Sequence, residues 1–293
     1  MADWLATLYP ASDRFWGPLL PHLLGEHLAA TVLIARCDAL DGPARCATAT
    51  QWTNALDTLA RASVNHPLTP ALTHLLAVAP NAAAPAATSV ATAAQRPQPL
   101  VDALTMLADS ADVELMVALR DATPRDTVSL REFTGYVLTS LVTRLRPMAA
   151  ARPETMPALA ASLTSLSGHL GTGEGALATM KEAVTTYRAL ATKRPDAFLP
   201  DLAASLDSLG DRLTSLGRRD QALAAIGEAV TTYRVLAQAR PAFRPDLAVS
   251  LYNLSASLAG LGRRDEALAA MNEAVGIRRA LAKAQPRPLW TIS

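Results

Sequence analysis

The sequence predicts an all-α protein in which an irregular N-terminal array of helices precedes three stacked helix pairs. Leucine and alanine recur every three or four residues over much of the chain, which is the spacing of one helix face. No segment of residues 1–150 has the alternation of polar and apolar side chains expected of a half-buried strand. Residues 151–293 repeat a two-helix pattern three times.

The composition excludes several classes of protein. Of 293 residues, 50% are hydrophobic and only 18% are charged, which excludes a disordered chain. Aromatic residues make up 4%, too few for a protein that stacks the bases of single strands. The 27 basic and 26 acidic residues leave a net charge of +1, which does not concentrate nucleic acid or anionic membrane. No apolar run approaches the length of a membrane span. We therefore expect neither nucleic acid nor a membrane as partner.

Residues 1–150 form the predicted irregular helical domain. Helical spacing appears around 22–36, 49–64, 69–78, 99–109, 111–121 and 126–147. The segment Asp41–Pro43 is predicted to be a break. The Ala-, Pro- and Thr-rich stretch 79–98 is the most loop-like part of this half, because prolines interrupt it repeatedly.

Residues 151–293 contain three units, at about 151–195, 196–241 and 242–286, followed by a short tail. Between Pro200–Ala239 and Pro245–Ala284, 24 of 40 aligned positions are identical without a gap. The earliest copy begins at Pro157 and loses three residues in its Gly-rich turn, so we expect the helices of the first pair to splay.

Each unit is predicted to be two helices joined by a short turn. In the second unit, Gly217 ends the first helix and Asp220 caps the next. Arg240 and Pro241 end the unit. The inner faces are predicted to consist of Leu202, Leu206, Leu209, Leu213 and Leu216 in the first helix and Ala222, Ile226, Ala229, Val230, Tyr233 and Leu236 in the second. The third unit repeats the pattern with Leu251, Leu254, Leu258, Gly262, Ala267, Met271, Ala274 and Leu281.

These spacings resemble the tetratricopeptide repeat (TPR) family, in particular the long-period repeats of kinesin light chains and of actinobacterial proteins. The resemblance rests on Leu209, Gly210, Leu213, Ala222, Ile226 and Ala229, and on Leu254, Ser255, Leu258, Ala267, Met271 and Ala274. Leu213 and Leu258 depart from the pattern, since they stand where the family has an aromatic residue. The resemblance implies a right-handed α-solenoid of three TPR-like helix pairs, and a bacterial protein.

The resemblance also implies a concave groove, lined by the first helices, that binds a protein or peptide partner. Asn253 stands at the family's groove asparagine, which hydrogen-bonds the backbone of an extended ligand, and Ser165 and Ser208 stand at this position in the other units. The groove residues implied by the alignment are Ala204, Asp207, Asp211 and Thr214 in the second unit and Val249, Tyr252, Asn253 and Ala256 in the third. The function expected is therefore a non-enzymatic scaffold for protein–protein interaction.

A second resemblance keeps an alternative open. The segment from Leu8 to Leu28 is similar to the region that follows the nucleotide-binding module in STAND-type NTPases of actinobacteria, which often carry such repeats. It implies that the chain is the sensor or regulatory C-terminal portion of a STAND-type signalling ATPase, whose NTPase module is absent from this chain.

No motif indicates catalysis, a cofactor or a metal. Residues 168–175 approach a phosphate-binding loop, but Glu174 replaces the required lysine. His22 and His27 lie about 140° apart around a helix, too far to share a metal ion. Asp207 and Asp211 are four residues apart, and we favour a solvated or partner-facing role over an acid/base pair. The sequence therefore predicts that the protein is not an enzyme.

Two cysteines, Cys37 and Cys46, are too few for a disulfide framework and have no base beside them in sequence that would make them reactive. Nothing at the start of the chain resembles a signal peptide. A cytoplasmic location is expected.

Paired arginines follow the turns, at Arg218–Arg219 and Arg263–Arg264, and a further pair is Arg278–Arg279. We favour solvated helix ends neutralised by Asp220, Asp265 and Glu266 over a basic stripe. The last unit is predicted to expose Leu281, unless Leu289 and Trp290 fold over it. Self-association through this edge is a further hypothesis.

Overall fold

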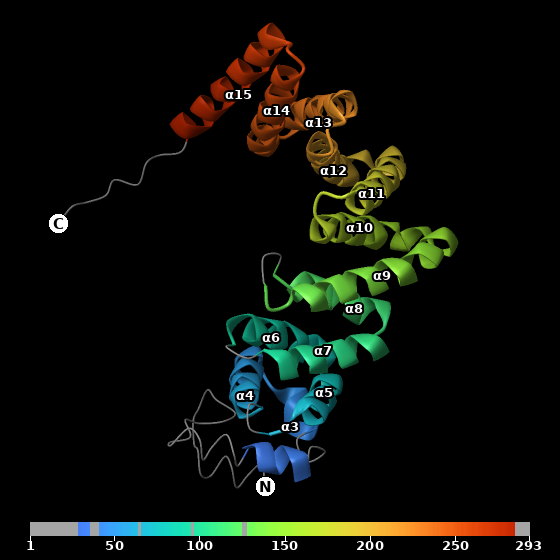
Figure 1. Ribbon diagram of the computed structural model, residues 1–293, viewed down its shortest axis with the longest axis vertical. Helices are drawn as coiled ribbons and strands as arrows, with labels where there is room; N and C mark the ends of the chain where they lie inside the picture. Colours follow the sequence, from blue (N-terminus) through green and yellow to red (C-terminus); the bar gives the residue numbers. More distant parts are fainter. Residues whose placement is uncertain (1–28, 36–40, 64–65, 95–96, 125–127, 285–293) are drawn as a thin grey trace, which may run out of the picture. The chain divides into compact units, whose positions relative to one another are not determined.

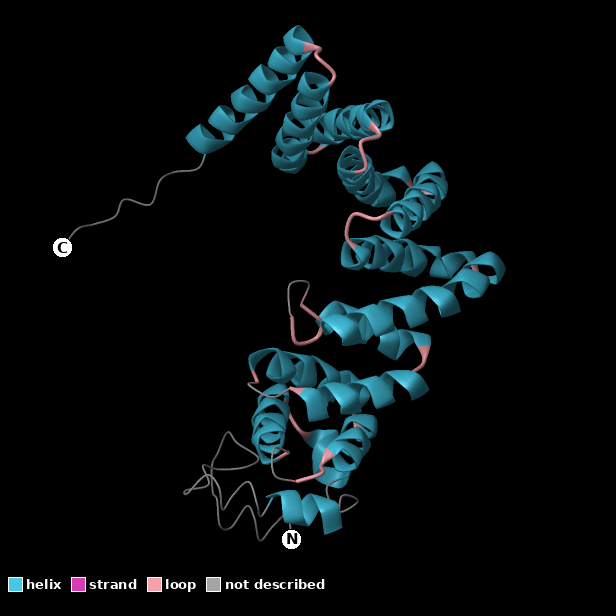
Figure 2. Ribbon diagram, viewed as in Figure 1, coloured by secondary structure: helices cyan, strands magenta, loops and turns pink. Residues whose placement is uncertain are grey.

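The fold is all-α. The computed structural model describes residues 29–35, 41–63, 66–94, 97–124 and 128–284. Every regular element in these ranges is a helix, with no strand among them (Figure 2). An N-terminal helical array precedes three consecutive helix pairs along the chain, so the predicted fold class is confirmed. The chain divides into two compact units between Leu145 and Arg146.

The first unit is an array of short helices that pack mostly on their second neighbours. After a helical segment at residues 29–35, it contains α3 (Asp41–Cys46), α4 (Ala49–Ala62), α5 (Thr69–Val78), α6 (Pro80–Ala93), α7 (Gln98–Ser110), α8 (Val113–Ala122) and most of α9 (Arg131–Ala151). Helix α4 packs on α6, α5 on α7, and α6 on α8 (Figure 1). Neighbouring helices along the chain therefore do not form the simple pairs seen in the second unit.

Two predictions for this unit were wrong. Most of the stretch predicted as a loop is α6, whose buried side chains are chiefly alanines that allow close packing with α4 and α8. Pro80 lies in its first turn, where the missing N–H breaks no helical hydrogen bond. The Thr88 hydroxyl donates to the Ala122 carbonyl at 3.2 Å and ties α6 to the end of α8. The predicted break at Asp41 is likewise the first turn of α3, which tolerates Pro43 for the same reason.

The second unit contains the three helix pairs. They are α10 (Met156–Leu170) with α11 (Glu174–Lys193), α12 (Pro195–Ser215) with α13 (Arg219–Ala239), and α14 (Arg244–Gly260) with α15 (Arg264–Ala284); single turns of 3₁₀ helix lie at Pro153–Thr155 and Pro241–Phe243. The second helix of each pair also packs against the first helix of the next, α11 on α12 and α13 on α14. Each pair is therefore held by its neighbour as well as by its own turn.

Glycines in the left-handed region of backbone space shape the turns. Gly171, Gly217 and Gly262 have φ of +80°, +73° and +77°. The predicted stop at Gly217 is confirmed. Asp220 is not the cap that we predicted: α13 begins at Arg219, so Asp220 lies in its first turn, where its charge still favours the helix N-terminus.

The first pair does not splay as expected. Its shortened turn still lets the Ser167 hydroxyl of α10 donate to the Ala176 carbonyl of α11 at 2.7 Å. In the third pair, Ser255 makes the same bond to the Ala267 carbonyl at 2.8 Å. The two bonds have nearly equal lengths. The shorter turn of the first pair therefore does not separate its two helices.

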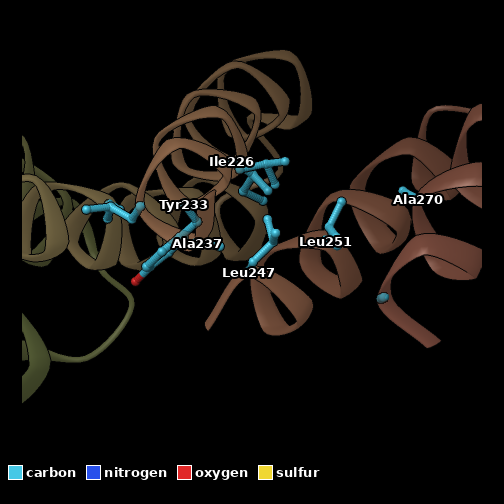
Figure 3. Packing of buried hydrophobic residues seen from close by; sticks show 10 residues of the cluster. Ile226, Tyr233, Ala237, Leu247, Leu251 and Ala270 are labelled. Carbon is cyan, nitrogen blue, oxygen red and sulfur yellow. The ribbon is translucent and has the colours of Figure 1, made fainter. Parts of the chain in front are cut away.

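The predicted inner faces form the core between pairs. Tyr233 and Leu236 of α13 pack against Leu247 and Leu251 of α14, in one cluster with Ala270 of α15 (Figure 3). The burial predicted for both helices of the second unit is confirmed, apart from Leu216, which is half-buried. This apolar contact is the main attraction between successive pairs.

Arginine–glutamate pairs join α9 to α11, α11 to α13, and α13 to α15. They are Arg146 with Glu182 at 2.8 Å, Arg188 with Glu228 at 2.5 Å, and Arg234 with Glu273 at 2.6 Å. Each arginine donates from two nitrogens to both carboxylate oxygens. Because the partners are roughly half-exposed, each pair contributes little energy, at most about 1 kcal/mol. Their repetition favours one register between units.

Replacing Gly210 by alanine is expected to destabilise the second unit. An added Cβ would lie 2.3 Å from Cγ1 of Ile226, a stiff β-branched side chain that is buried. We expect Gly210→Ala to lower the free energy of unfolding by about 1–3 kcal/mol. The matched control is Gly227→Ala in α13, where the new Cβ meets nothing and should stabilise the helix by about 0.5–1 kcal/mol. Urea titration measures both, and equal effects would contradict the close contact.

Candidate functional site

The predicted groove residues lie on the outward side of two neighbouring first helices. We name this set the first-helix face: Ala204, Asp207, Asp211 and Thr214 on α12, and Val249, Tyr252, Asn253 and Ala256 on α14. All are exposed except Asp207 and Asn253, which are half-buried. Whether they bind a partner stays a prediction. Val249 and Tyr252 are 46% and 53% exposed and belong to the exposed large apolar side chains of this unit, with Leu170, Val235 and Leu268.

A hydrogen bond joins the two helices across this face. Ser250 of α14 is buried, and its hydroxyl donates to Oδ1 of Asp207 on α12 at 2.9 Å. On the other side of α12, Nε of Arg212 donates to the Ser167 hydroxyl of α10 at 2.6 Å. The first helices of all three pairs are thus connected side to side. Sequence reasoning missed Ser250 and Arg212, because their partners are more than forty residues away.

The Asp207 carboxyl is kept in an unfavourable environment. Burial raises its pKa to about 6, the Ser250 hydrogen bond opposes that rise, and the charges of Asp211 and Asp246 add to it. Burial also raises the pKa of Asp211, while the charge of Arg212 acts the other way. In the first-helix face, the ionised forms of Asp207 and Asp211 are therefore less favourable than they would be in water.

The acidic side chains of the first and second helices differ in their ion pairs. The glutamates of the second helices pair with arginines, as described above. Asp201, Asp207, Asp211 and Asp246, on the first helices, form no ion pair within the described part of the chain. Among the described residues Asp220 and Asp265, on the second helices, also form no ion pair, so the contrast holds for the glutamates and not for every acidic residue.

The turn arginines pair with glutamates. Arg218 donates to Glu174 of the preceding unit at 2.7 Å, and Arg263 donates to Glu266 at 2.6 Å. Glu266 was a predicted partner, whereas Glu174 was not. Glu174 begins α11, so the glycine-rich segment before it is a helix-to-helix turn and does not follow a strand.

Potential metal ligands are scattered. Nε2 of His74 lies 2.8 Å from Oδ1 of Asp41, and Cys46 is an exposed free thiol. Within the ranges that the structure describes, no three His, Cys, Asp or Glu side chains are grouped to hold a metal ion. No helix there combines the length and hydrophobicity needed to cross a membrane.

Several predictions lie outside the described residues. They concern the segment from Leu8 to Leu28 with its similarity to STAND proteins, the histidines His22 and His27, Cys37, and the tail residues Leu289 and Trp290. Leu281 is half-buried near the end of α15. Self-association through this edge stays a prediction.

The substitution Asp207→Asn is expected to stabilise the protein at alkaline pH only. Since the folded-state pKa of Asp207 is raised from 3.8 to about 6, the folded state loses stability as pH rises between these values. The variant, which keeps an oxygen acceptor for Ser250, should gain about 1 kcal/mol at about pH 8 and nothing at about pH 4. Thermal unfolding at both pH values measures this. Asp220→Asn, an exposed control, should show no gain, and an equal gain in both variants would refute the burial argument.

Family models match three segments of the chain, all within the second unit. Residues 202–239 and 247–285 match the tetratricopeptide repeat. Residues 149–193 match anaphase-promoting complex subunit 5. No curated protein matches the sequence.

Solved structures resemble the chain in fold. BtubC (BKLC) from P. vanneervenii is 18% identical, with 90% of this chain and 97% of that chain covered and a TM-score of 0.52. MamA is 18% identical, with 64% and 91% covered and a TM-score of 0.43. MamA MSR-1 C2 is 19% identical, with 66% and 93% covered and a TM-score of 0.36. The match to the tetratricopeptide repeat model covers the second and third helix pairs, while the kinesin-light-chain-like and actinobacterial assignments stay predictions.

Proposed function

We propose that this chain is a non-enzymatic scaffold that binds a protein or peptide partner on the first-helix face of its tetratricopeptide repeats. Repeats of this type are generally non-catalytic interaction modules. The STAND-type alternative depends on residues 8–28, which lie outside the described ranges, and stays a second hypothesis. Cytoplasmic location likewise remains an expectation.

The observation that carries the proposal is that Val249 and Tyr252 are exposed on α14, the helix whose Ser250 donates a hydrogen bond to the half-buried Asp207 of the adjacent α12. Exposed aromatic side chains beside charged groups are typical of protein interfaces, where the aromatic ring supplies most of the binding energy. A buried carboxylate that costs stability is also common where function, rather than folding, maintains it. Val235 and Leu268 are exposed apolar side chains of the second helices, so the feature that sets the first-helix face apart is the half-buried carboxyl of Asp207.

The test is a comparison of partners captured by the wild type and by two triple variants. Asp207→Ala, Tyr252→Ala and Asn253→Ala together remove the centre of the first-helix face. The matched control replaces Thr231, Val235 and Gln238, three exposed residues of α13, by alanine. Proteins retained by the wild type and by the control are expected to be lost from the first-helix variant.

Calorimetry with one such protein, purified, then measures the change in affinity, expected to be at least about tenfold for loss of an interface centre. Equal capture and equal affinity for both triple variants would contradict the proposal. Circular dichroism confirms beforehand that both variants keep their helix content.

A further inference from the structure

Helix α15 is covered on fewer sides than the other second helices of the unit. Helix α11 packs on both α10 and α12, and α13 packs on both α12 and α14. Helix α15 packs on α14 and is the last helix in the described ranges (Figure 1). On α13, the face that packs with α14 is at most 7% exposed and consists of Ile226, Val230, Tyr233 and Ala237.

The corresponding face of α15 is open. In the repeat alignment, the positions of those four residues are occupied in α15 by Met271, Val275, Arg278 and Ala282. Met271 and Val275 are half-buried, whereas Arg278 and Ala282 are exposed. One turn earlier on the same face, Leu268 is 61% exposed. We name these five residues the α15 stripe.

The α15 stripe has the spacing of a helix-pairing seam. Its members, from Leu268 to Ala282, are separated alternately by three and four residues. This is the spacing of the a and d positions of a heptad, which place side chains on one face for contact with another helix. The α15 stripe is therefore suited to pack against a helix outside its own pair.

Opposite charges flank the two ends of the stripe. Asp265, Asn272 and Arg279 recur at intervals of seven residues, and so lie along one edge of it. Neither Asp265 nor Arg279 forms an ion pair with a residue that the structure describes. About 21 Å of helix separates the two side chains, so they cannot pair with each other within one copy.

Arg279 stands where earlier units bind the unit that follows. Arg188 and Arg234 hold the same position in α11 and α13, and they pair with Glu228 and Glu273. Arg279 has no such acid within the described part of the chain. A segment that covers the α15 stripe as closely is therefore expected to bring an acidic side chain to Arg279.

A second copy of α15, running antiparallel, supplies that acid. With a twofold axis beside Asn272, Asp265 of each copy adjoins Arg279 of the other, so two ion pairs form. The same register sets Met271 of one copy against Val275 of the other. The antiparallel arrangement also brings the acidic first turn of each helix to the basic end of its partner.

A further helix of the α14 type fits the stripe less well. Helix α14 packs against the aromatic ring of Tyr233, whereas α15 has Arg278 at that position. Burying the guanidinium under leucine side chains without an acid would be costly. In the antiparallel pair, the aliphatic part of Arg278 covers Leu268 of the second copy, and its charge lies beside the acidic first turn of that copy.

We propose that the α15 stripe is the interface of a homodimer in which the two α15 helices pack antiparallel. This gives the self-association expected from the sequence a defined surface and register. The first-helix face takes no part in it, so a dimer presents two such faces to a partner and gains affinity for a partner with two binding segments. One helix from each copy makes a small interface, so the dimer is expected to be weak.

Sedimentation velocity of the full chain tests the proposal. Between about 1 and 200 µM, the range in which a small interface associates, the sedimentation coefficient should rise from that of a monomer to that of a dimer. Met271→Glu places a charge at the centre of the stripe and should weaken association more than about tenfold. The matched control is Val235→Glu on α13, where a 56% exposed apolar side chain receives the same charge, and association should be unchanged.

A charge exchange tests the antiparallel register. Asp265→Lys and Arg279→Glu each remove both ion pairs and create repulsion, so each should weaken association by about five- to tenfold. The double variant restores opposite charges across the interface, and its association should return to within about twofold of the wild type. Circular dichroism checks that all variants keep their helix content.

Several outcomes would overturn the inference. A chain that stays monomeric throughout this range would show that no second copy covers the stripe, whether its own residues 285–293 or another protein does so. Species larger than a dimer would indicate a head-to-tail contact instead. Equal association of Met271→Glu and Val235→Glu would place the interface elsewhere, and a double variant no better than the single ones would contradict the antiparallel register.

Discussion

The structure of the second unit depends on one constraint: no helix pair can bury its apolar flank alone. Tyr233 and Leu236 of α13 are buried in one cluster with Leu247 and Leu251 of the next unit. At about 25 cal/mol per Å² of apolar surface, such contacts outweigh the exposed ion pairs. The units are therefore held together by burial, and the arginine–glutamate pairs favour the register in which burial occurs.

The same packing determines what the outward side of the unit displays. Because α13 packs against both α12 and α14, these two first helices lie side by side, close enough for Ser250 to donate to Asp207. Exposed Val249 and Tyr252 then adjoin carboxylates that have no basic partner among the described residues. The carboxylates of Glu182, Glu228 and Glu273 are ion-paired, whereas that of Asp207 accepts a hydrogen bond from Ser250.

The sequence predicts most of the helix pairs because their signals are local. The leucine spacing of α12 and the glycine at its end determine the buried face and the turn without reference to other units. The helix α6 was missed because its prolines resemble loop signals, whereas alanine-mediated packing with α4 and α8 outweighs them.

The candidate site was predicted only in part. Family alignment placed Asp207, Tyr252 and Asn253 on the outward side of first helices, where they are exposed or half-buried. It did not identify Ser250, because the hydrogen bond from Ser250 to Asp207 arises between units whose register the sequence does not display. One signal in the sequence indicates the ion pairs: a glutamate recurs six residues before Arg188 and before Arg234. The aspartates of the first helices have no recurring basic residue of this kind.

Hydrogen exchange in a Leu247→Ala variant tests most directly whether units stabilise each other. Leu247 lies in α14 but covers side chains of α13, and it is 6% exposed. If burial between units is the central constraint, amide exchange must accelerate in α12 and α13 as well as in α14 and α15. Acceleration confined to α14 and α15 would show that each pair is stable on its own, and would contradict this account.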